Sequence, residues 1–330
     1  MRAVRVHEPG GPEQLRYEEV PDPLIERPGQ VKVAIRAAGV NPVDTKVRAR
    51  GPMFAEGLPF IPGCDAAGEI VEVGSEVTDR AVGDRVFFCY GGLGSAPGTY
   101  AEFAVVDAER ARPLPDAVDF NTAAAAPLVA ITAWESLFDR ARLQPDQTLL
   151  VHAGAGGVGH VALQLAHLQG ARIATTVGSR NRLGFVGGLG ADEIIVYTER
   201  DFVDATLAWT DGRGVEVALD TVGGATWRRT VEAVAHYGDL VTLLNPGQVD
   251  LTEARTRNLR LSFELMLTPQ LRGLAEALDH QGEILDQCAR WLARGELRVA
   301  VEETLALEQV VEAHRRLEAG GMQGKVVLRP

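Results

Sequence analysis

The stretch Thr148–Gly170, TLLVHAGAGGVGHVALQLAHLQG, decides the fold of this chain. It opens with the apolar run Leu149–Val151, continues through a glycine cluster, and then repeats apolar residues at helical spacing as far as Leu168. Gly170 stands where a helix would end. Strand, glycine turn and helix form the context in which the pattern G-x-G-x-x-G predicts dinucleotide binding. The expected cofactor contacts of this turn are Gly154, Gly156, Gly157, Val158 and Gly159.

The glycines of such a turn have a physical purpose. They permit a tight turn and allow the backbone to approach a pyrophosphate closely. The N–H groups at the start of the following helix then hold the negative charge.

The composition is typical of a soluble globular protein. The chain has 330 residues, 46% hydrophobic and 24% charged, which suffices for two domains and a large core. A net charge of −12 disfavours nucleic-acid binding, which needs a basic surface. No apolar run approaches the length of a membrane span, and the first residues lack a signal-peptide pattern. We therefore expect a cytoplasmic protein with no nucleic-acid or membrane partner.

The residues before Asn121 read as short strands separated by glycine and proline, which predicts a small, mainly antiparallel β-barrel. Thr122–Phe138 is rich in helix formers and is divided by Pro127, and it leads into a second domain. From Thr148 onward, strands and helices alternate, which predicts a doubly wound parallel sheet of six strands. These strands are expected at Thr148–His152, Arg172–Val177, Glu193–Tyr197, Val215–Asp220, Asp239–Leu244 and Arg260–Leu265.

The C-terminal part predicts two helices and one strand. The helices are expected at Gln270–Arg294, with a break near Gly282, and at Leu307–Gly320. The strand is expected at Gly324–Arg329. We expect this tail to pack onto the N-terminal barrel, so that residues 1–121 and 268–330 form one discontinuous domain and residues 122–267 form the dinucleotide-binding domain.

Several motifs along the whole chain share one pattern. They are Gly39–Asp44, Pro62–Gly68, Val82–Val86, Gly98–Glu102, Ala125–Leu137, Ala153–Gly159 and Gly324–Leu328. Together they resemble the medium-chain dehydrogenase/reductase superfamily, and within it the zinc-independent quinone oxidoreductase (zeta-crystallin-like) branch. This resemblance implies a GroES-like β-barrel catalytic domain, a Rossmann NADP(H)-binding domain and a homodimer.

The assignment to a zinc-independent branch depends on missing ligands. In the zinc-dependent members of this superfamily, three segments supply a Cys, a His within Gly-His-Glu, and a second Cys. The corresponding segments here are Val40–Pro42, Gly63–Asp65 and Ala126–Leu128. A catalytic zinc needs about three protein ligands, and only Cys64 and Asp65 qualify. We therefore expect no metal.

The residues after the second strand of the sheet favour NADPH. An NAD site normally has an acid about 20 residues after the glycine pattern, to bind the ribose 2′-OH. Here the segment contains Ser179, Arg180 and Arg182 instead, which suit a 2′-phosphate. The alternative is that Ser179 caps a helix and the arginines are merely solvated. The resemblance also implies that Tyr197 lies beside the adenosine phosphate, although a Tyr at a strand end often only packs.

The nicotinamide end is expected at the carboxyl edge of the same sheet, facing the barrel. The resemblance implies that segments containing Leu244, Asn245 and Leu267 hold the carboxamide, mostly through their backbones. Lys325 would reach a cofactor phosphate; the alternative is a solvated lysine.

The candidate catalytic residue is Asn41. The resemblance places its amide near the nicotinamide and the substrate, where it donates to an oxygen. The alternative is a turn residue before Pro42. Thr45 occupies a position where several relatives carry Tyr, which disfavours a phenolic proton donor there.

The resulting hypothesis is an NADPH-dependent, zinc-independent reductase of quinones or conjugated enones. In such an enzyme the cofactor carries the chemistry and the protein aligns it. One alternative is a reductase of 2-enoyl thioesters or alkenals in the same branch. Another is an NADPH-binding regulatory or structural protein with little turnover. A homodimer would form by pairing the edge strand Arg260–Leu265 of two sheets.

Overall fold

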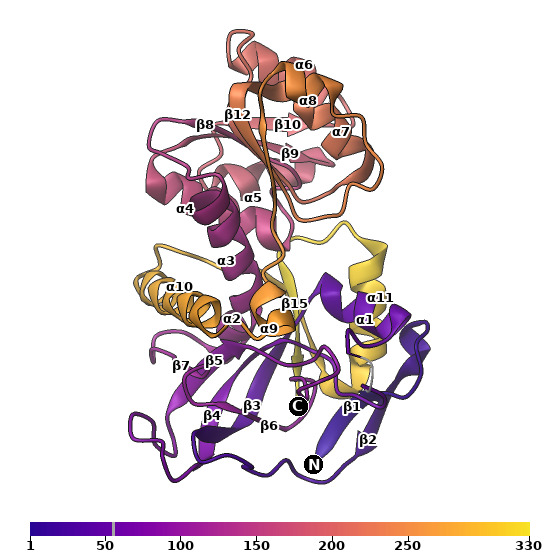
Figure 1. Ribbon diagram of the computed structural model, residues 1–330, viewed down its shortest axis with the longest axis vertical. Coiled ribbons are helices and arrows are strands. Elements are labelled where there is room, and N and C mark those ends of the chain that lie inside the picture. The colour runs from indigo at the N-terminus through magenta and orange to yellow at the C-terminus, as the bar shows by residue number, and fades with distance from the viewer. Residues whose placement is uncertain (55–56) are drawn as a thin grey trace. The chain divides into compact units, whose positions relative to one another are not determined.

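The computed structural model describes residues 1–54 and 57–330, and these form two compact units (Figure 1). Unit 1 comprises Met1–Leu128 and Leu267–Pro330, and unit 2 comprises Val129–Met266. The expected boundary at Asn121 differs from this division because helix α2 (Phe120–Ala125) lies in unit 1. Its buried residues Ala123, Ala124 and Ala125 pack on the sheet of that unit, so the chain leaves unit 1 only after α2.

Unit 2 contains the predicted parallel sheet of six strands. They are β8 (Thr148–Val151), β9 (Arg172–Val177), β10 (Glu193–Val196), β11 (Val215–Asp220), β12 (Val234–Thr242) and β13 (Arg260–Phe263). Their order is β10-β9-β8-β11-β12-β13, and all pairs are parallel. The order in which the chain adds strands reverses at β8, because β9 and β10 lie on one side of it and β11, β12 and β13 lie on the other. Ligands bind at this reversal point, between β8 and β11, in folds of this class. The expected doubly wound fold is confirmed.

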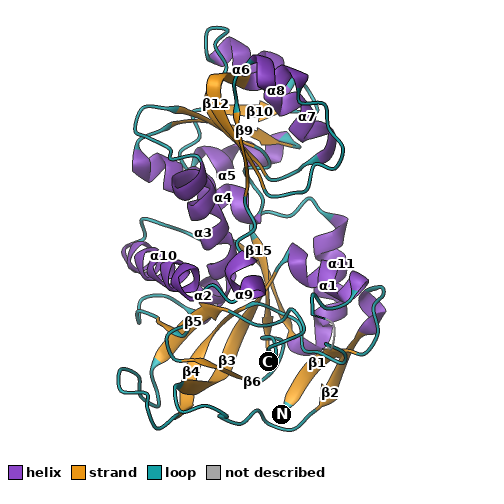
Figure 2. Ribbon diagram, viewed as in Figure 1, coloured by secondary structure: helices purple, strands orange, loops and turns teal. Residues whose placement is uncertain are grey.

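Helices cover both faces of this sheet, as Figure 2 shows. The helices are α3 (Pro127–Trp134) with the following π-helical turn η2 (Glu135–Arg140), α4 (Gly157–Gln169), η3 (Arg180–Arg182), α5 (Leu183–Gly187), α6 (Phe202–Trp209), α7 (Gly224–Ala233) and α8 (Thr252–Thr256). Phe202 of α6, Trp227 of α7 and Ala254 of α8 share one hydrophobic core with the inward residues of the strands. This core packs the three helices onto the sheet whose carboxyl edge carries the loops described below.

Unit 1 is built on a mainly antiparallel sheet with the order β14-β15-β3-β4-β5-β7, and β6 also pairs with β3. The strands are β3 (Gln30–Val40), β4 (Asp65–Val73), β5 (Arg85–Cys89), β6 (Phe103–Asp107), β7 (Arg112–Pro113), β14 (Val301–Ala306) and β15 (Lys325–Arg329). A second sheet pairs β1 (Arg2–Val6) with β2 (Leu15–Glu19). The C-terminal strand β15 pairs with the end of β3, so the tail belongs to unit 1.

Strand β14 was not among the predicted strands. It is half exposed along its length and contains two adjacent glutamates, Glu302 and Glu303. Its apolar alternation is therefore too weak to stand out in the sequence.

The helices of unit 1 correct one expectation. They are η1 (Pro12–Gln14), α1 (Pro42–Arg50), α2, α9 (Thr268–Arg272), α10 (Ala275–Arg294), η4 (Leu307–Gln309) and α11 (Val310–Ala319). The predicted break near Gly282 is wrong, because α10 runs through it without interruption. The chain breaks instead at Gly273, whose φ of 65° ends α9 in the left-handed conformation.

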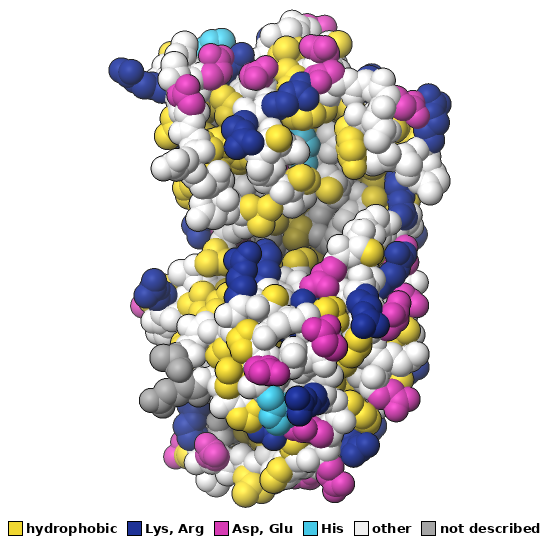
Figure 3. Space-filling model, turned by 90° about the vertical axis from the view of Figure 1, so that its right-hand side faces the viewer, with side chains coloured by type: hydrophobic (Ala, Val, Ile, Leu, Met, Phe, Trp, Pro, Cys, Tyr) yellow, Lys and Arg dark blue, Asp and Glu magenta, His cyan; other side chains and the backbone are white. Residues whose placement is uncertain are grey.

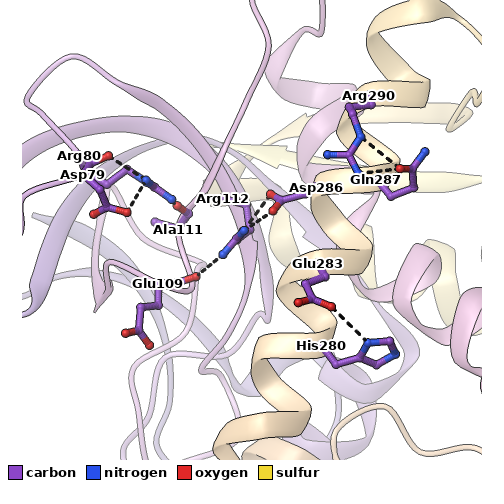
Figure 4. Close-up of polar contacts among 10 residues, drawn as sticks. All are labelled: Asp79, Arg80, Glu109, Ala111, Arg112, His280, Glu283, Asp286, Gln287 and Arg290. Atoms are coloured by element: carbon purple, nitrogen blue, oxygen red, sulfur yellow. Dashed lines mark hydrogen bonds and ion pairs between the residues drawn. The ribbon is translucent and has the colours of Figure 1, made fainter.

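Gly282 has a packing role in this helix. A Cβ at that position would lie 3.3 Å from Nη1 of Arg112. The Arg112 guanidinium crosses the helix there and donates from Nε to Asp286 Oδ1 over 2.9 Å (Figure 4). The missing side chain thus makes room for an arginine that attaches α10 to β7.

The surface carries charges of both signs. On the face shown in Figure 3, basic and acidic side chains are interspersed on both units. Among the residues that the structure describes, no helix is long and apolar enough to cross a membrane.

Candidate functional site

The glycine turn between β8 and α4 separates into two kinds of glycine. A Cβ at Gly154 would overlap the Thr175 hydroxyl, and one at Gly159 would overlap the Ala153 carbonyl oxygen. These two glycines are therefore required by the packing of the turn itself. Gly156 differs, because its φ of −79° and ψ of 178° suit any residue. The nearest atom to a Cβ there is Ala153 O at 3.2 Å, so its bare backbone mainly leaves room on the outer side of the turn.

The start of α4 presents backbone donors beside Gly156. Gly157, Val158 and Gly159 form the first turn of this helix, where the backbone N–H groups have no acceptor within the helix. The N–H of His160 closes the turn by donating to Gly156 O over 3.0 Å. First-turn N–H groups together with the helix dipole attract an anion such as a phosphate.

The loops at the reversal point of the sheet are fixed by one buried carboxylate. Asp220, the last residue of β11, accepts N–H groups of Val222 over 3.0 Å and of Gly223 over 2.9 Å. Its other oxygen accepts the Thr242 hydroxyl over 2.9 Å. The Thr221 hydroxyl in turn donates to His152 O over 2.8 Å, so the loops after β8, β11 and β12 hold one another in place.

His152 is a buried structural residue. Its two ring nitrogens lie 3.2 Å from the Thr176 hydroxyl and 2.9 Å from the Thr230 hydroxyl. Burial lowers the pKa of His152 to about 4, against a smaller opposite effect of Asp220. The imidazole is therefore neutral near pH 7.

The residues expected at the adenosine end gather at the carboxyl ends of β9 and β10. The Tyr197 N–H donates to Val177 O over 3.1 Å. The Tyr197 side chain is 55% exposed, and a Cβ at Gly178 would lie 2.9 Å from its hydroxyl oxygen. Ser179 occupies the N-cap position of η3 but makes no capping bond; its hydroxyl contacts Asn181 Oδ1. Arg182 ends the same turn.

Glu199 was missed by the sequence analysis. It forms a two-pronged ion pair with Arg180, in which Nε lies 2.8 Å from Oε1 and Nη2 lies 2.6 Å from Oε2. The pair lowers the pKa of Glu199 and raises that of Arg180. The parallel register provides the missing signal, because Val177 pairs with Val196 and the two charged residues follow these strand ends at equal distance.

The segment after β12 contains Leu244 and Asn245. The Leu244 side chain lies against Gly223, where an added Cβ would come within 2.7 Å of its Cδ1. The Asn245 side chain accepts the Gly247 N–H over 2.9 Å and so shapes its own turn. Both side chains therefore make contacts within their own loops. The backbone of this segment is what it could offer to a ligand.

In unit 1 the structure joins two residues that were predicted separately, Asn41 and Lys325. Asn41 is fully buried, and its Nδ2 donates to Asp65 Oδ2 over 2.9 Å. Its Oδ1 accepts from Lys325 Nζ, which also donates to Val40 O over 2.9 Å. Lys325 is only 3% exposed, so the alternative of a solvated lysine is wrong, and its ammonium group donates to partners inside unit 1. Leu267 is buried just before α9.

A second buried pair lies beside Asn41. The Tyr100 hydroxyl donates to Asp44 Oδ2 over 2.8 Å, and the Asn41 N–H donates to the same oxygen over 2.8 Å. Asp44 therefore caps α1 and keeps Tyr100 in the core. Burial raises the pKa of Asp44 to about 7, against the hydrogen bonds of Asn41 and Tyr100.

Cys64 lies in the segment Gly63–Asp65, one of the three that correspond to the zinc-ligand segments of the superfamily. The Cys64 thiol is buried and donates to Gly91 O over 3.4 Å, and burial raises its pKa. Within residues 1–54 and 57–330, no group of three or more His, Cys, Asp or Glu side chains is arranged to hold a metal ion.

Comparisons with known proteins cover the whole chain. Two family models match it, an alcohol dehydrogenase GroES-like domain over residues 27–116 and a zinc-binding dehydrogenase over residues 189–328. A quinone oxidoreductase of Pseudomonas aeruginosa is 35% identical over 322 residues, which cover 97% of each chain.

Two solved structures have nearly the same fold. An alcohol dehydrogenase superfamily protein from Novosphingobium aromaticivorans is 34% identical, with a TM-score of 0.92 over 100% of this chain and 99% of its own. The Escherichia coli quinone oxidoreductase complexed with NADPH is 30% identical, with a TM-score of 0.89 over 100% of both chains.

Proposed function

Because this chain belongs to the medium-chain dehydrogenase/reductase superfamily and is an oxidoreductase, we propose that it transfers hydride from NADPH to a quinone or a conjugated enone. The observation that carries this proposal is the turn at Gly156. Its open backbone and the adjoining first-turn N–H groups of α4 form a cradle for a pyrophosphate at the reversal point of the sheet.

The cofactor preference rests on the other end of the same site. No acid follows β9 between Gly178 and Arg182, whereas Ser179 and Arg182 offer a hydroxyl and a cation to a 2′-phosphate. The exposed ring of Tyr197 lies against Gly178, the residue before Ser179, and would cover the adenosine. The Escherichia coli relative holds NADPH, which supports the same assignment here.

The nicotinamide of the bound cofactor supplies the hydride. The part of the chain is to hold and align it. Asp220 fixes the loops around the reversal point, and the backbone at Leu244, Asn245 and Leu267 would hold the carboxamide. Quinones and enones already delocalise the arriving charge, so hydrogen-bond donors suffice to stabilise it. We assign one such donor to Asn41, whose Nδ2 carries a second hydrogen besides the one given to Asp65.

A substrate panel tests the activity. We expect NADPH to reduce quinones or enones in the presence of the protein, and the enoyl thioesters and alkenals to react more slowly. Faster turnover of enoyl thioesters would favour the alternative reductase. Tight NADPH binding with no turnover of any acceptor would favour a regulatory or structural protein.

We also propose a homodimer that forms through β13. In the described part of unit 2 this strand is the last of its sheet and pairs only with β12. Phe263 at its end is 60% exposed and Leu265 is 51% exposed. An open strand edge with exposed apolar side chains favours pairing with a second copy.

A further inference from the structure

A buried lysine lies at the junction of three segments of unit 1. Lys325 opens β15, and its Nζ donates to Val40 O over 2.9 Å and to the side-chain oxygen of Asn41. The Asn41 amide is in turn bonded to a carboxylate, because its Nδ2 donates to Asp65 Oδ2 over 2.9 Å. The other oxygen of Asp65 accepts the Leu128 N–H over 3.0 Å. A single chain of hydrogen bonds thus runs from an ammonium group through an amide to a carboxylate.

The charges in this chain depend on each other. Burying an isolated charge is costly, and the cost falls when an opposite charge lies nearby. Burial lowers the pKa of Lys325, while the charge of Asp65 opposes that shift most. Burial raises the pKa of Asp65, and the charge of Lys325 opposes that shift most. The two groups therefore stabilise each other's ionised form although the Asn41 amide lies between them.

The same contacts fix the orientation of the Asn41 amide. An ammonium group can only donate and an ionised carboxylate can only accept. Lys325 therefore holds Oδ1 at one end and Asp65 holds Nδ2 at the other. Without the ammonium group, Val40 O and Asn41 Oδ1 would be buried acceptors that have lost a donor, and the amide could rotate.

We propose that Lys325 is a positioning residue whose internal cation neutralises Asp65 and orients the Asn41 amide for the reaction. Its ammonium group donates to two oxygen atoms, those of the Val40 carbonyl and the Asn41 amide. The consequence for catalysis rests on the proposed function, whereas the charge coupling does not.

The coupling is tested by a double-mutant cycle in the full-length chain. Lys325→Met and Asp65→Asn should each lower the urea midpoint of unfolding. The double variant carries neither charge, so its midpoint should lie above that of Lys325→Met alone. Losses that simply add would overturn the proposal. If Lys325→Met yields no folded protein, recovery of folded protein in the double variant supports the coupling, and failure of both overturns it.

A matched control lies on the same strand as Val40. Arg36 of β3 pairs with Glu69 of β4, with Nε 3.0 Å from Oε2, and the two side chains are 53% and 35% exposed. Arg36→Met and Glu69→Gln should shift the midpoint only slightly, and their effects should add, because exposed ion pairs contribute little.

The positioning role has its own readout. In Lys325→Met, kcat with the best acceptor should fall about tenfold or more, as when a supporting hydrogen-bond partner is lost. The Kd of NADPH, followed by nicotinamide fluorescence, should stay within about twofold, since Lys325 Nζ is committed to Val40 O and Asn41 Oδ1. Weaker NADPH binding with unchanged kcat would overturn the proposal and make Lys325 a cofactor ligand. Unfolding needs no turnover, so a failed substrate panel would leave the test of the charge coupling intact.

Discussion

Arg180 and Glu199 neutralise each other at the carboxyl edge of the unit 2 sheet, with Nε 2.8 Å from Oε1 and Nη2 2.6 Å from Oε2. The pair is solvent-accessible, since Arg180 is 74% exposed and Glu199 is 41% exposed. Arg180, one of the two arginines expected to bind a 2′-phosphate, is therefore already paired with the carboxylate of Glu199. Glu199 therefore reduces the net positive charge that Arg180 can offer to a phosphate.

The first prediction concerns Arg182. Arg182→Asp should weaken NADPH binding by about tenfold or more, because a charge-assisted contact is replaced by repulsion. Binding of NADH, which lacks the phosphate, should change little. Fluorescence titration with both cofactors measures the difference. Equal losses for the two cofactors would show that Arg182 does not bind the phosphate.

Glu199 gives the complementary prediction. Glu199→Gln removes an anion beside the expected phosphate and releases Arg180, so NADPH should bind a few times more tightly. The gain should shrink at high salt, because both side chains are exposed. An unchanged NADPH Kd at low salt would mean that the phosphate lies elsewhere.

The glycine turn predicts a separation of binding from stability. Gly156→Ala should weaken NADPH binding about tenfold or more while lowering the Tm only slightly, because the added Cβ meets only Ala153 O, at 3.2 Å. Gly159→Ala should instead lower the Tm clearly, because its Cβ overlaps a backbone carbonyl. Gly184→Ala is the control, since no atom lies within 4 Å of its Cβ. A Gly156→Ala protein with normal NADPH affinity would contradict this account of the site.

Unfolding at acid pH tests the buried histidine of α11. His314 is fully buried, and its Nδ1 lies 3.2 Å from Nη1 of Arg48. Burial, reinforced by the charge of Arg48, lowers the pKa of His314 to about 3. Below about pH 6.5 the unfolded chain binds a proton there that the folded chain does not. This stability is complete above pH 6.5 and is lost as the pH falls toward 3.

The corresponding variant is His314→Gln, which keeps an acceptor for Arg48 but does not titrate. Between pH 7 and pH 5 the wild-type free energy of unfolding should fall by about 2 kcal/mol more than that of the variant. His152 and Asp44 titrate equally in both proteins and cancel from the comparison. Urea unfolding at the two pH values measures the difference, and equal slopes would refute the assignment.

The proposed dimer depends on the edge of β13. Phe263→Asp should convert a dimer into a 35.4 kDa monomer, because it places a charge on the apolar edge. Light scattering after size-exclusion chromatography gives the mass. Leu251→Asp is the control, since Leu251 is also exposed in unit 2 but lies outside the strand. A monomeric wild-type protein would contradict the proposal directly.

Local patterns in the sequence determined most of the fold. The strand–glycine–helix pattern at Thr148–Gly170 and the alternating strands and helices that follow predicted all six strands of the parallel sheet. These features are readable because hydrophobic periodicity and turn residues act over a few neighbouring positions. The short range of such patterns also explains why the break predicted near Gly282 was wrong. Its role depends on Arg112, which lies far away in the chain and is invisible to a local pattern.

The tertiary structure alone decided which polar groups meet. Asn41 and Lys325 are 284 positions apart, and Arg180 and Glu199 belong to different loops, yet each pair is in contact. Sequence analysis named Asn41, Lys325 and Arg180 as candidates with two interpretations each: a catalytic donor or a turn residue for Asn41, and a cofactor ligand or a solvated side chain for Lys325 and Arg180. Only the fold shows which groups each of these side chains contacts, because contacts between residues distant in the chain leave no local pattern in the sequence.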